Sequence, residues 1–502
     1  MGGGCRTRAE RVVRRLNARG VLVTVGLLLL CYTPLLLRGS AYDNGDLGNC
    51  TMPLLRYFAE AGDGWYPYLL AGRPGVIDGT LYCRWYPPTL LYLLLPADNY
   101  FGLSMVAHVI LAALGMVCLV RSLGRSAAAA AAAAVVFAGS GFFTARIFLG
   151  QYPHVMSMAW APWLFAAAVQ VRRRGGPLAA LALGAVAGVQ LLAGFPQFVV
   201  ITLLGIAVWW LASWRRRQWD RVRNIRTVLL LLISTGVFVA MTAHEIMPLA
   251  TMLAHSQRAG GLADSESRRE RVKMPGFLTQ SLLTPATVQA MTSTGNYWEV
   301  AAYAGWAAPA MVLLALLRRR LWRRATVAWW AVGATALILA CGVPLPGTEF
   351  LRSPGRFLLS GMLAAAVLTA YAADGLLRRA RWRWLSVAVI MLELLPGSCL
   401  LTGLSPAQRP GLPAWSQSDR LIAFLRATPR SERMVALADA MMLNEAAVLR
   451  VETLNGYQGV VSGKLLRLGR AFDPAISGAS PMKYPSYAPR LFALLGVRYV
   501  VT

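Results

Sequence analysis

The chain alternates between long apolar segments and polar connections. About eleven apolar segments are long enough, at about 17 to 25 residues, to cross a bilayer as helices. They lie near residues 21–37, 101–120, 126–146, 155–171, 177–194, 197–214, 227–248, 301–317, 325–341, 357–377 and 385–402. A bilayer-spanning segment must satisfy its own backbone hydrogen bonds, which a helix does. The pattern therefore predicts an all-α polytopic membrane protein with about 11 transmembrane helices.

The polar connections are of two kinds, and the two kinds alternate along the chain. Arginine-rich turns fall on the same side as the arginine-rich N-terminus 1–20, at 121–125, 172–174, 215–226, 318–324 and 378–383. Long connections that contain acids fall on the other side, at 38–100, 249–300, 342–356 and 403–502. Cytoplasmic turns carry the excess of arginine and lysine in membrane proteins. We therefore expect a cytoplasmic N-terminus and an extracytoplasmic C-terminus.

Composition supports the membrane class and excludes a soluble one. The chain is 57% hydrophobic and 14% charged, and its mean hydropathy is +0.50. A net charge of +28 would suggest nucleic acid as the partner of a soluble protein, but here the arginines lie in short turns between spans, so we expect no nucleic-acid partner. The dominance of arginine over lysine and the alanine-rich runs are typical of a G+C-rich bacterial genome. We therefore expect multi-pass insertion in a bacterial plasma (inner) membrane.

The chain divides into three parts by hydropathy. The first is the cytoplasmic segment 1–20, which precedes an apolar run without a signal-cleavage site and is therefore interpreted as leading into an uncleaved first span. The second is the transmembrane region 21–402 with its large external loop, residues 38–100, here called loop 1. The last part, 403–502, is less apolar and contains strand-like runs at 434–437 and 497–501, which predict a small α/β extracytoplasmic region.

Loop 1 contains the carboxylates that stand out most clearly. Asp43 and Asp46 are three residues apart, a spacing that puts both on one face of a helical turn. Such a pair suits an acid and a base, or a divalent cation such as Mg²⁺ or Mn²⁺, which prefers oxygen ligands. The alternative is that both are ordinary solvated carboxylates, and spacing alone favours it.

The cysteines show no metal-binding pattern, since they include no C-x-x-C and no Cys/His cluster with zinc spacing. Cys50 and Cys83 both lie in loop 1. If loop 1 faces an oxidising compartment, a disulfide between them would close the loop on itself. Two separate thiols are an equally weighted alternative.

A series of short motifs covers nearly the whole chain. They are Gly45-Asp46 with Pro53, Trp65-Tyr66-Pro67 with Gly72, Trp85-Tyr86-Pro87-Pro88, Gly150-Gln151 with Trp160 and Pro162, Gly194-Phe195-Pro196-Gln197, Glu245 to Pro248 with Ser256 and Arg258, Tyr297-Trp298-Glu299 with Tyr303 and Gly305, Arg352-x-Pro354-x-Arg356-Phe357, Asn455-Gly456-Tyr457 and Leu494-Leu495-Gly496-Val497-Arg498-Tyr499. Their order and spacing resemble the YfhO-like bacterial membrane proteins, which are similar to C-type (GT-C) glycosyltransferases. Two features depart from the family pattern. Cys50 stands where the family usually has glutamine, and the chain stops at Thr502, where relatives usually continue into a larger external domain.

The resemblance implies a GT-C-like fold and transfer of a sugar from a polyprenyl-phosphate-linked donor. The acceptor would be a cell-envelope glycopolymer, a glycolipid or a protein on the outer face of the membrane. In an inverting transfer a carboxylate takes the proton of the acceptor hydroxyl. Asp46 matches the family's acid and is the expected base, while Asp43 would assist it, bind a cation, or simply be solvated.

The donor phosphate needs cationic hydrogen-bond donors, and arginine supplies them in a fork-shaped arrangement. Arg352 and Arg356, four residues apart beside a span, are the first candidates, and Arg84 is the third. The alternative is that these arginines extend toward lipid headgroups. The motif Gly194-Phe195-Pro196-Gln197 places Gln197 among the implied substrate-binding residues.

Aromatic and acidic residues complete the implied site. Glu299 would bind sugar hydroxyls or act as a second acid; equally, it would be a carboxylate favoured at a helix N-terminus. Trp85 and Tyr86 would stack on sugar rings, although aromatic residues at such positions are more often anchors at the membrane interface.

Two other functions remain open. A lipid or solute transporter places its ionisable residues near the middle of the bilayer, and Glu393 and, more weakly, His108 occupy such positions. A non-catalytic scaffold of the same fold is the third alternative. Acids and arginines are more numerous in the external segments than in the middle of the spans, which favours the transferase.

Overall fold

The computed structural model describes most of the helical part of the chain and parts of the long connections between helices. The described residues are 18, 20–30, 32–33, 46–61, 65–74, 83–95, 97–214, 221–256, 259, 272, 299–322, 324–346, 351, 353–403, 423–425, 427, 432–437, 444–456, 462–472 and 488–502.

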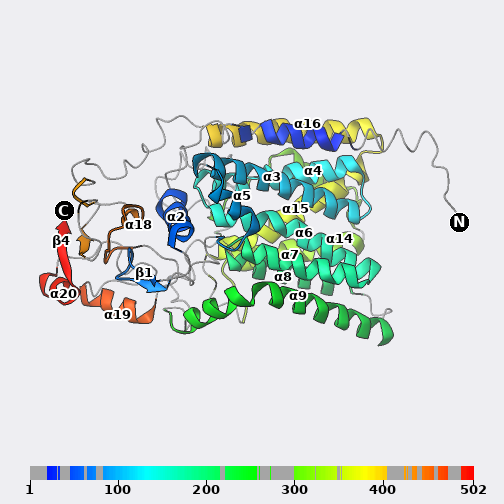
Figure 1. The fold of residues 1–502 in the computed structure, drawn as a ribbon. Helices are drawn as coiled ribbons and strands as arrows, with labels where there is room; N and C mark the ends of the chain where they lie inside the picture. Colours follow the sequence, from blue (N-terminus) through cyan, green and yellow to red (C-terminus); the bar gives the residue numbers. More distant parts are fainter. Residues whose placement is uncertain are drawn as a thin grey trace.

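Long helices lie side by side and form one bundle (Figure 1). Each apolar segment of the sequence coincides with a helix or with a pair of consecutive helices. In chain order these are the helix Gly20–Leu30, α3 (Ala97–Ser122), α4 (Ala127–Ala138) with α5 (Gly141–Phe148), α6 (Tyr152–Arg174), α7 (Pro177–Leu192), α8 (Pro196–Ala212), α9 (Arg221–Ala254), α13 (Ala307–Leu317), α14 (Arg324–Ala340), α15 (Leu358–Leu376) and α16 (Ala380–Gly403). The predicted all-α membrane class is confirmed.

The number of membrane crossings is a separate question from the number of helices. Within the described part of the chain, four helical runs are long and apolar enough to cross a membrane by length and composition: Tyr100–Ser122, Ala127–Phe148, Ile225–Ala254 and Pro354–Leu376. Shorter apolar helices accompany them, among them Pro177–Leu192 and Pro196–Ala212. The count of about 11 spans stays a prediction.

Small residues allow the helices of the bundle to approach closely. The alanine-rich helix α4 is buried along its whole length and lies against α3, α15 and α16. On α7, Gly184 and Gly188 face α9, and a Cβ at Gly184 would lie 2.3 Å from the carbonyl oxygen of Ser234. Glycines spaced four residues apart are a common device for helix packing in membranes. Small residues at these positions therefore let the helix backbones approach closely.

The arginine-rich turns gather at one end of the bundle. Side-chain contacts join them to one another: Arg173 with the Ser122 carbonyl, Arg172 with the Trp210 carbonyl, Ser126 with Asp374, and Arg383 with Asp374. The alternation read from the sequence therefore corresponds to two real ends of the structure. Which end faces the cytoplasm remains the prediction made from arginine content.

Topology can be measured with single cysteines placed in a background that lacks the native ones. Positions 60, 280 and 450 are expected to react with a membrane-impermeant thiol reagent from outside, and positions 220 and 320 only after the membrane is opened. The reason is the arginine bias of the turns around 220 and 320. Outside labelling at either of those two positions would contradict the predicted orientation.

The opposite end of the bundle carries the segments predicted to be external. In loop 1 these are η2 (Leu47–Thr51), α2 (Met52–Ala61), the antiparallel pair β1 (Trp65–Tyr66) and β2 (Arg73–Pro74), and η5 (Pro87–Leu93). In the C-terminal region, β3 (Arg433–Ala436) pairs in parallel with β4 (Val497–Val501), and α18 (Glu445–Leu449), α19 (Gly463–Phe472) and α20 (Pro489–Leu494) accompany them. Figure 1 shows these elements together beyond one end of the bundle. The predicted small C-terminal sheet is confirmed.

Glu393 of α16, the acid that the transporter hypothesis depends on, caps another helix. Its carboxylate accepts hydrogen bonds from the backbone N–H groups of Trp306 and Ala307, at 2.9 Å for Ala307. These are the first N–H groups of α13, which lack partners inside their own helix, and a carboxylate there also favours the helix dipole. Capping accounts for an acid in an apolar helix without any role in transport.

Candidate active site

Asp46 lies where loop 1 meets the bundle, immediately before η2. Its backbone N–H donates to the carbonyl of Leu149 at 3.1 Å, and its Oδ2 accepts a hydrogen bond from Nε2 of Gln151 at 3.3 Å. Both partners belong to the turn between α5 and α6, so this turn fixes both the backbone and the carboxylate of Asp46. The side chain is half-buried. Asp43, the predicted partner of Asp46, lies outside the described residues.

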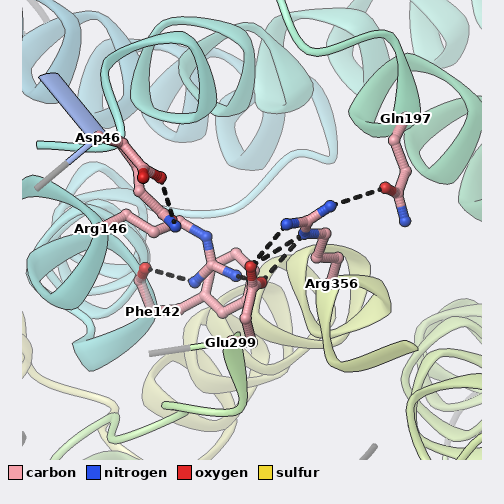
Figure 2. Close-up of polar contacts among 7 residues, drawn as sticks. Asp46, Phe142, Arg146, Gln197, Glu299 and Arg356 are labelled. Carbon is pink, nitrogen blue, oxygen red and sulfur yellow. Dashed lines mark hydrogen bonds and ion pairs between the residues drawn. The ribbon is translucent and has the colours of Figure 1, made fainter. Parts of the chain in front are cut away.

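Glu299 receives hydrogen bonds from two arginines of different helical elements (Figure 2). Arg146 of α5 donates from Nη2 to Oε2 at 3.0 Å, and Arg356 donates from Nη2 to Oε1 at 2.6 Å and from Nε at 3.0 Å to Oε2. The exposed fractions are 0% for Arg146, 2% for Glu299 and 9% for Arg356. We call these three residues the charge triad. Buried charges are stable only when they are paired and hydrogen-bonded, as they are here.

The contacts of Glu299 within the charge triad indicate its structural role. Both carboxylate oxygens accept from guanidinium groups, and the residue precedes α13 by several positions instead of capping it. The contacts therefore support a role in positioning Arg146 and Arg356, which differs from both alternatives proposed from the sequence. Arg146 also donates from Nη1 to the carbonyl of Phe142 at 3.1 Å.

Arg356 is oriented by the turn before α8. Its Nη1 donates to Oε1 of Gln197 at 3.1 Å, and its guanidinium carbon lies 4.6 Å from the ring centroid of Phe195. Phe195 adopts a positive φ of 54° directly before Pro196, a conformation that a bulky residue adopts only when its surroundings hold it. His154 stacks on the same ring, with centroids 3.6 Å apart. The Gly194-Phe195-Pro196-Gln197 motif thus contacts Arg356 through both Phe195 and Gln197.

Of the two arginines predicted to bind phosphate beside this span, the structure describes one. Arg356 belongs to the short 3₁₀ helix η8 (Pro354–Phe357) at the start of α15. Arg352 lies outside the described residues.

Arg84 belongs to a second group of residues, which lies beside α9. Its guanidinium lies over the rings of Phe58 and Trp85, at 4.7 and 4.9 Å. Burial lowers the pKa of Arg84, and the negative charge of Glu245 opposes that shift. Trp85 is 42% exposed and meets His244 edge to face. Both Arg84 and Trp85 remain accessible enough to contact a ligand.

The burial and contacts of Tyr86 do not agree with the prediction that it stacks on a sugar. It is 1% exposed, its hydroxyl lies 2.6 Å from Nε2 of His108, and it accepts from Nε1 of Trp160 at 2.9 Å. The His108 Nδ1 lies 2.6 Å from the carbonyl of Ser104, which can only accept, so Nδ1 carries a proton; in the neutral ring Nε2 then accepts from the Tyr86 hydroxyl. Tyr86 anchors loop 1 to α3 and α6. His108 has a structural role in this anchor, which removes it from the candidates for transport.

The predicted disulfide is not formed, although Cys50 and Cys83 are both among the described residues. The Cys83 thiol donates to the carbonyl of Ala193 at 2.8 Å, so it points into the turn between α7 and α8. Burial and the nearby charge of Glu245 raise the pKa of the Cys83 thiol well above its usual value. Cys83 is a buried packing residue of the bundle end, and the loop-closing role was wrong.

Within the described ranges, no group of three or more His, Cys, Asp or Glu side chains could hold a metal ion. The Asp46 carboxylate is one oxygen ligand that such an ion could use, and Gln151 lies within hydrogen-bond distance of it. A Mg²⁺ or Mn²⁺ ion would need further oxygens, from Asp43, water or a substrate phosphate.

Sequence reasoning missed two residues of the site. Arg146 lies within a segment assigned as a span, where an isolated charge in an apolar helix is itself a signal of function. Gln151 was part of a motif but was not assigned to the site, and its contact with Asp46 spans 105 positions of sequence. No local pattern predicts such a pairing.

The arrangement brings a carboxylate and a set of guanidinium groups to one bundle end. Asp46 is held by residues 149 and 151, and the N–H of Gln151 donates to the carbonyl of Arg146 at 2.9 Å, so the acid and the charge triad share one turn of backbone. A carboxylate can accept a proton, and arginines can stabilise an anionic leaving group. This is the chemistry that group transfer from a phosphate requires.

Comparison with known proteins gives the fold of the chain. No family model matches it, and no curated protein matches its sequence. Among solved structures it is similar to the arabinofuranosyltransferase AftD from Mycobacteria, with a TM-score of 0.58 and 16% identity over 91% of this chain and 33% of that one. It is also similar to ArnT from Cupriavidus metallidurans, with a TM-score of 0.55 and 14% identity over 90% and 88% of the two chains for the form bound to undecaprenyl phosphate. The apo form of ArnT gives a TM-score of 0.52 and 14% identity over 93% and 89%. The chain shares the fold of these two proteins, and it spans about a third of the length of AftD.

Proposed function

We propose that this protein is a membrane glycosyltransferase that moves a sugar from a polyprenyl-phosphate-linked donor to an acceptor on the outer face of a bacterial plasma membrane. The observation that carries the proposal is the position of Asp46. It lies at the end of a GT-C bundle, where Gln151 donates to its carboxylate. The N–H of Gln151 also donates to the carbonyl of Arg146, so one backbone turn contacts both Asp46 and the charge triad. The finer relationship to YfhO-like proteins is part of this proposal and rests on the order of the motifs.

In the proposed reaction Asp46 accepts the proton of the acceptor hydroxyl. The hydroxyl oxygen forms a bond to the anomeric carbon as the bond from that carbon to the phosphate oxygen breaks. The electron pair of the broken bond leaves with the polyprenyl phosphate, whose charge nearby arginines stabilise. Attack opposite the leaving group inverts the configuration of the anomeric carbon.

The structural neighbours support the type of donor. One of them is ArnT bound to undecaprenyl phosphate, and another is an arabinofuranosyltransferase. At 14–16% identity these similarities establish a shared fold, so the donor, the acceptor and the membrane sidedness are our proposals. We propose an envelope glycopolymer, a glycolipid or a protein as the acceptor.

A divalent cation is an optional part of the proposal. Mg²⁺ is usually bound by one or two carboxylates together with substrate phosphates and water, and Asp46 provides one such carboxylate. The steps assigned to Asp46 and the arginines do not depend on it.

The transporter alternative is less well supported by the contacts. Glu393 caps α13 and His108 is held by Tyr86 and Ser104. Both central ionisable residues therefore have structural partners, which a site that binds and releases an ion or solute would need to exchange.

The proposal is tested by deleting the gene and by assaying the purified protein. We expect one sugar to be lost or reduced among the envelope glycopolymers or glycolipids of the deletion strain. The purified protein in lipid nanodiscs is expected to transfer radiolabelled sugar from a polyprenyl-phosphate donor to an extract of the deletion strain's envelope. An unchanged envelope composition together with no transfer would overturn the proposal.

Arg352→Ala and Arg356→Ala are expected to weaken use of the donor. Arg356→Ala also removes a partner of the buried Glu299 carboxylate, so donor kinetics are compared per mole of folded, monodisperse protein. A lost charged hydrogen bond to phosphate costs on the order of 1.5 to 3 kcal/mol, which is roughly ten- to a hundredfold in kcat/KM for the donor. Arg467→Ala, an exposed arginine on α19, is the matched control and is expected to have no effect. Unchanged donor kinetics in both variants would show that another residue holds the phosphate, with Arg84 as the next candidate.

A further inference from the structure

Loop 1 makes an unusual turn between its two short strands. Leu70, Ala71 and Gly72 adopt consecutive positive φ angles of 57°, 65° and 96°. Left-handed backbone is uncommon for residues with a side chain and persists when surrounding contacts enforce it. Leu70 is also 4% exposed. Within loop 1 the N–H of Gly72 donates to the carbonyl of Leu69 at 2.9 Å, and further contacts come from outside loop 1.

The holding contacts come from residues 453–456 of the C-terminal region, which we call the hook. The backbone N–H of Leu70 donates to the carbonyl of Asn455 at 3.1 Å, and the N–H of Ala71 donates to the carbonyl of Thr453 at 3.0 Å. Gly456 packs against the same turn, because a Cβ at this position would lie 2.8 Å from Cγ of Leu70. The two partners are far apart in the sequence, so folding alone brings them together.

The hook is itself fixed to the C-terminal sheet. The Asn455 side chain accepts from the N–H of Ala436 at 2.7 Å and donates to the carbonyl of Ala436 at 2.7 Å. It therefore pairs with the edge of β3 as a backbone strand would. The N–H of Leu454 donates to the carbonyl of Met434 at 3.1 Å. These bonds make the hook a rigid extension of the β3–β4 sheet.

The turn held by the hook is connected to Asp46 through packed structure. Asp46 precedes η2 and α2, whose Leu54 and Phe58 are buried in the main core, and α18 of the C-terminal region also lies against α2. Loop 1 is thus fixed at three places: at the Asp46 end by Leu149 and Gln151, at the Tyr86 end by α3 and α6, and between them by the C-terminal region.

We infer that the hook, residues 453–456, is a positioning element that holds the Asp46-bearing loop in the arrangement needed for sugar transfer, an inference that rests on the proposed function. The C-terminal region is then a working part of the site through the contacts of the hook. This gives a physical reason for the Asn455-Gly456 pair, in which asparagine pairs with β3 and only glycine leaves space for Leu70.

The experiment compares Gly456→Ala with the double variant Gly456→Ala/Leu70→Ala. The added methyl group collides with Cγ and Cδ2 of Leu70, at 2.8 and 3.0 Å, whereas its next neighbour, Cβ of Leu69, is at an acceptable 3.4 Å. Truncating Leu70 removes both colliding atoms, so the double variant restores the fit. Gly176→Ala, which has open space around its Cβ, is the matched control at the other end of the bundle.

Hydrogen exchange of the full chain in nanodiscs measures the contact between the hook and loop 1 directly, because the amides of Leu70 and Ala71 donate the hydrogen bonds to the hook. In Gly456→Ala we expect exchange in the peptide 65–74 to be at least about tenfold faster, with near-normal exchange in the double variant and in Gly176→Ala. Unchanged exchange in Gly456→Ala, or no recovery in the double variant, would overturn the inference.

Activity provides the second readout and separates this inference from the proposed function. We expect kcat to fall in Gly456→Ala about tenfold or more with the donor KM little changed, and to recover in the double variant. Faster exchange with unchanged kcat would overturn the positioning role. If the wild-type protein transfers no sugar, the proposed function fails, while the exchange comparison still decides whether the hook holds loop 1.

Discussion

Asp46→Asn is expected to abolish sugar transfer while the protein remains folded. The amide keeps the size of the carboxylate and can still pair with Gln151, which holds Asp46 through a 3.3 Å hydrogen bond. It cannot accept a proton from the acceptor hydroxyl, and loss of a general base typically costs about 10²- to 10⁴-fold in rate. The measurement is initial transfer rate at saturating donor, together with monodispersity of the solubilised protein.

Glu393→Gln is the matched control for a carboxylate elsewhere in the bundle. The N–H groups of Trp306 and Ala307 donate to different oxygens of Glu393, and glutamine keeps only one of these acceptors. We therefore expect nearly normal transfer with a loss of stability from the weaker helix cap. Full activity in Asp46→Asn together with loss of activity in a well-folded Glu393→Gln would reject the transferase in favour of transport.

Glu299→Gln is expected to cause a large loss of folding stability. The change removes the negative charge shared by the Arg146 and Arg356 guanidinium groups in a site where Glu299 is 2% exposed. Breaking a buried ion pair by removing one partner costs about 3 to 5 kcal/mol. Thermal unfolding of the purified protein in detergent, followed by tryptophan fluorescence, measures the effect.

Two further variants show whether burial of the charge causes the loss of folding stability in Glu299→Gln. Arg498→Gln breaks an ion pair with Glu432 in which the arginine side chain is 67% exposed, and exposed pairs contribute about 0 to 1 kcal/mol. The triple variant Arg146→Met, Glu299→Leu and Arg356→Met removes all three charges together, and we expect it to recover much of the stability but no transfer. An unfolding temperature in Glu299→Gln equal to that of the wild type would show that the triad contributes little to the fold.

Features that depend on local sequence could be predicted well. The apolar segments coincide with helices from α3 to α16, because a bilayer-spanning chain must satisfy its backbone locally and therefore shows its helices as runs of apolar residues. The arginine-rich turns gather at one end because consecutive spans return the chain to the same side, and turns on that side carry the excess of arginine. The strands at 434–437 and 497–501 were identified from short apolar runs, and they pair as β3 and β4.

Assignments that depend on which side chains meet were less successful. Tyr86 and Trp85 are adjacent and both aromatic, yet Tyr86 is 1% exposed and Trp85 is 42% exposed. Cys50 and Cys83 share a loop, but Cys83 contacts Ala193 of a distant turn. The chain alone gives no means of choosing between these outcomes, since burial and thiol partners are set by the packing of helices far apart in sequence.

The sequence by itself determined the membrane class, the positions of the helices and the two ends of the bundle, and it placed Asp46 at one of those ends. Tertiary structure decided that Arg146 and Arg356 share Glu299, that Gln151 holds Asp46 and that Asn455 holds Leu70. The physical reason is the range of each effect. Hydropathy acts on consecutive residues and can be seen in any window of the chain, whereas a buried charge or an unusual turn is stable only with partners that folding brings from another element.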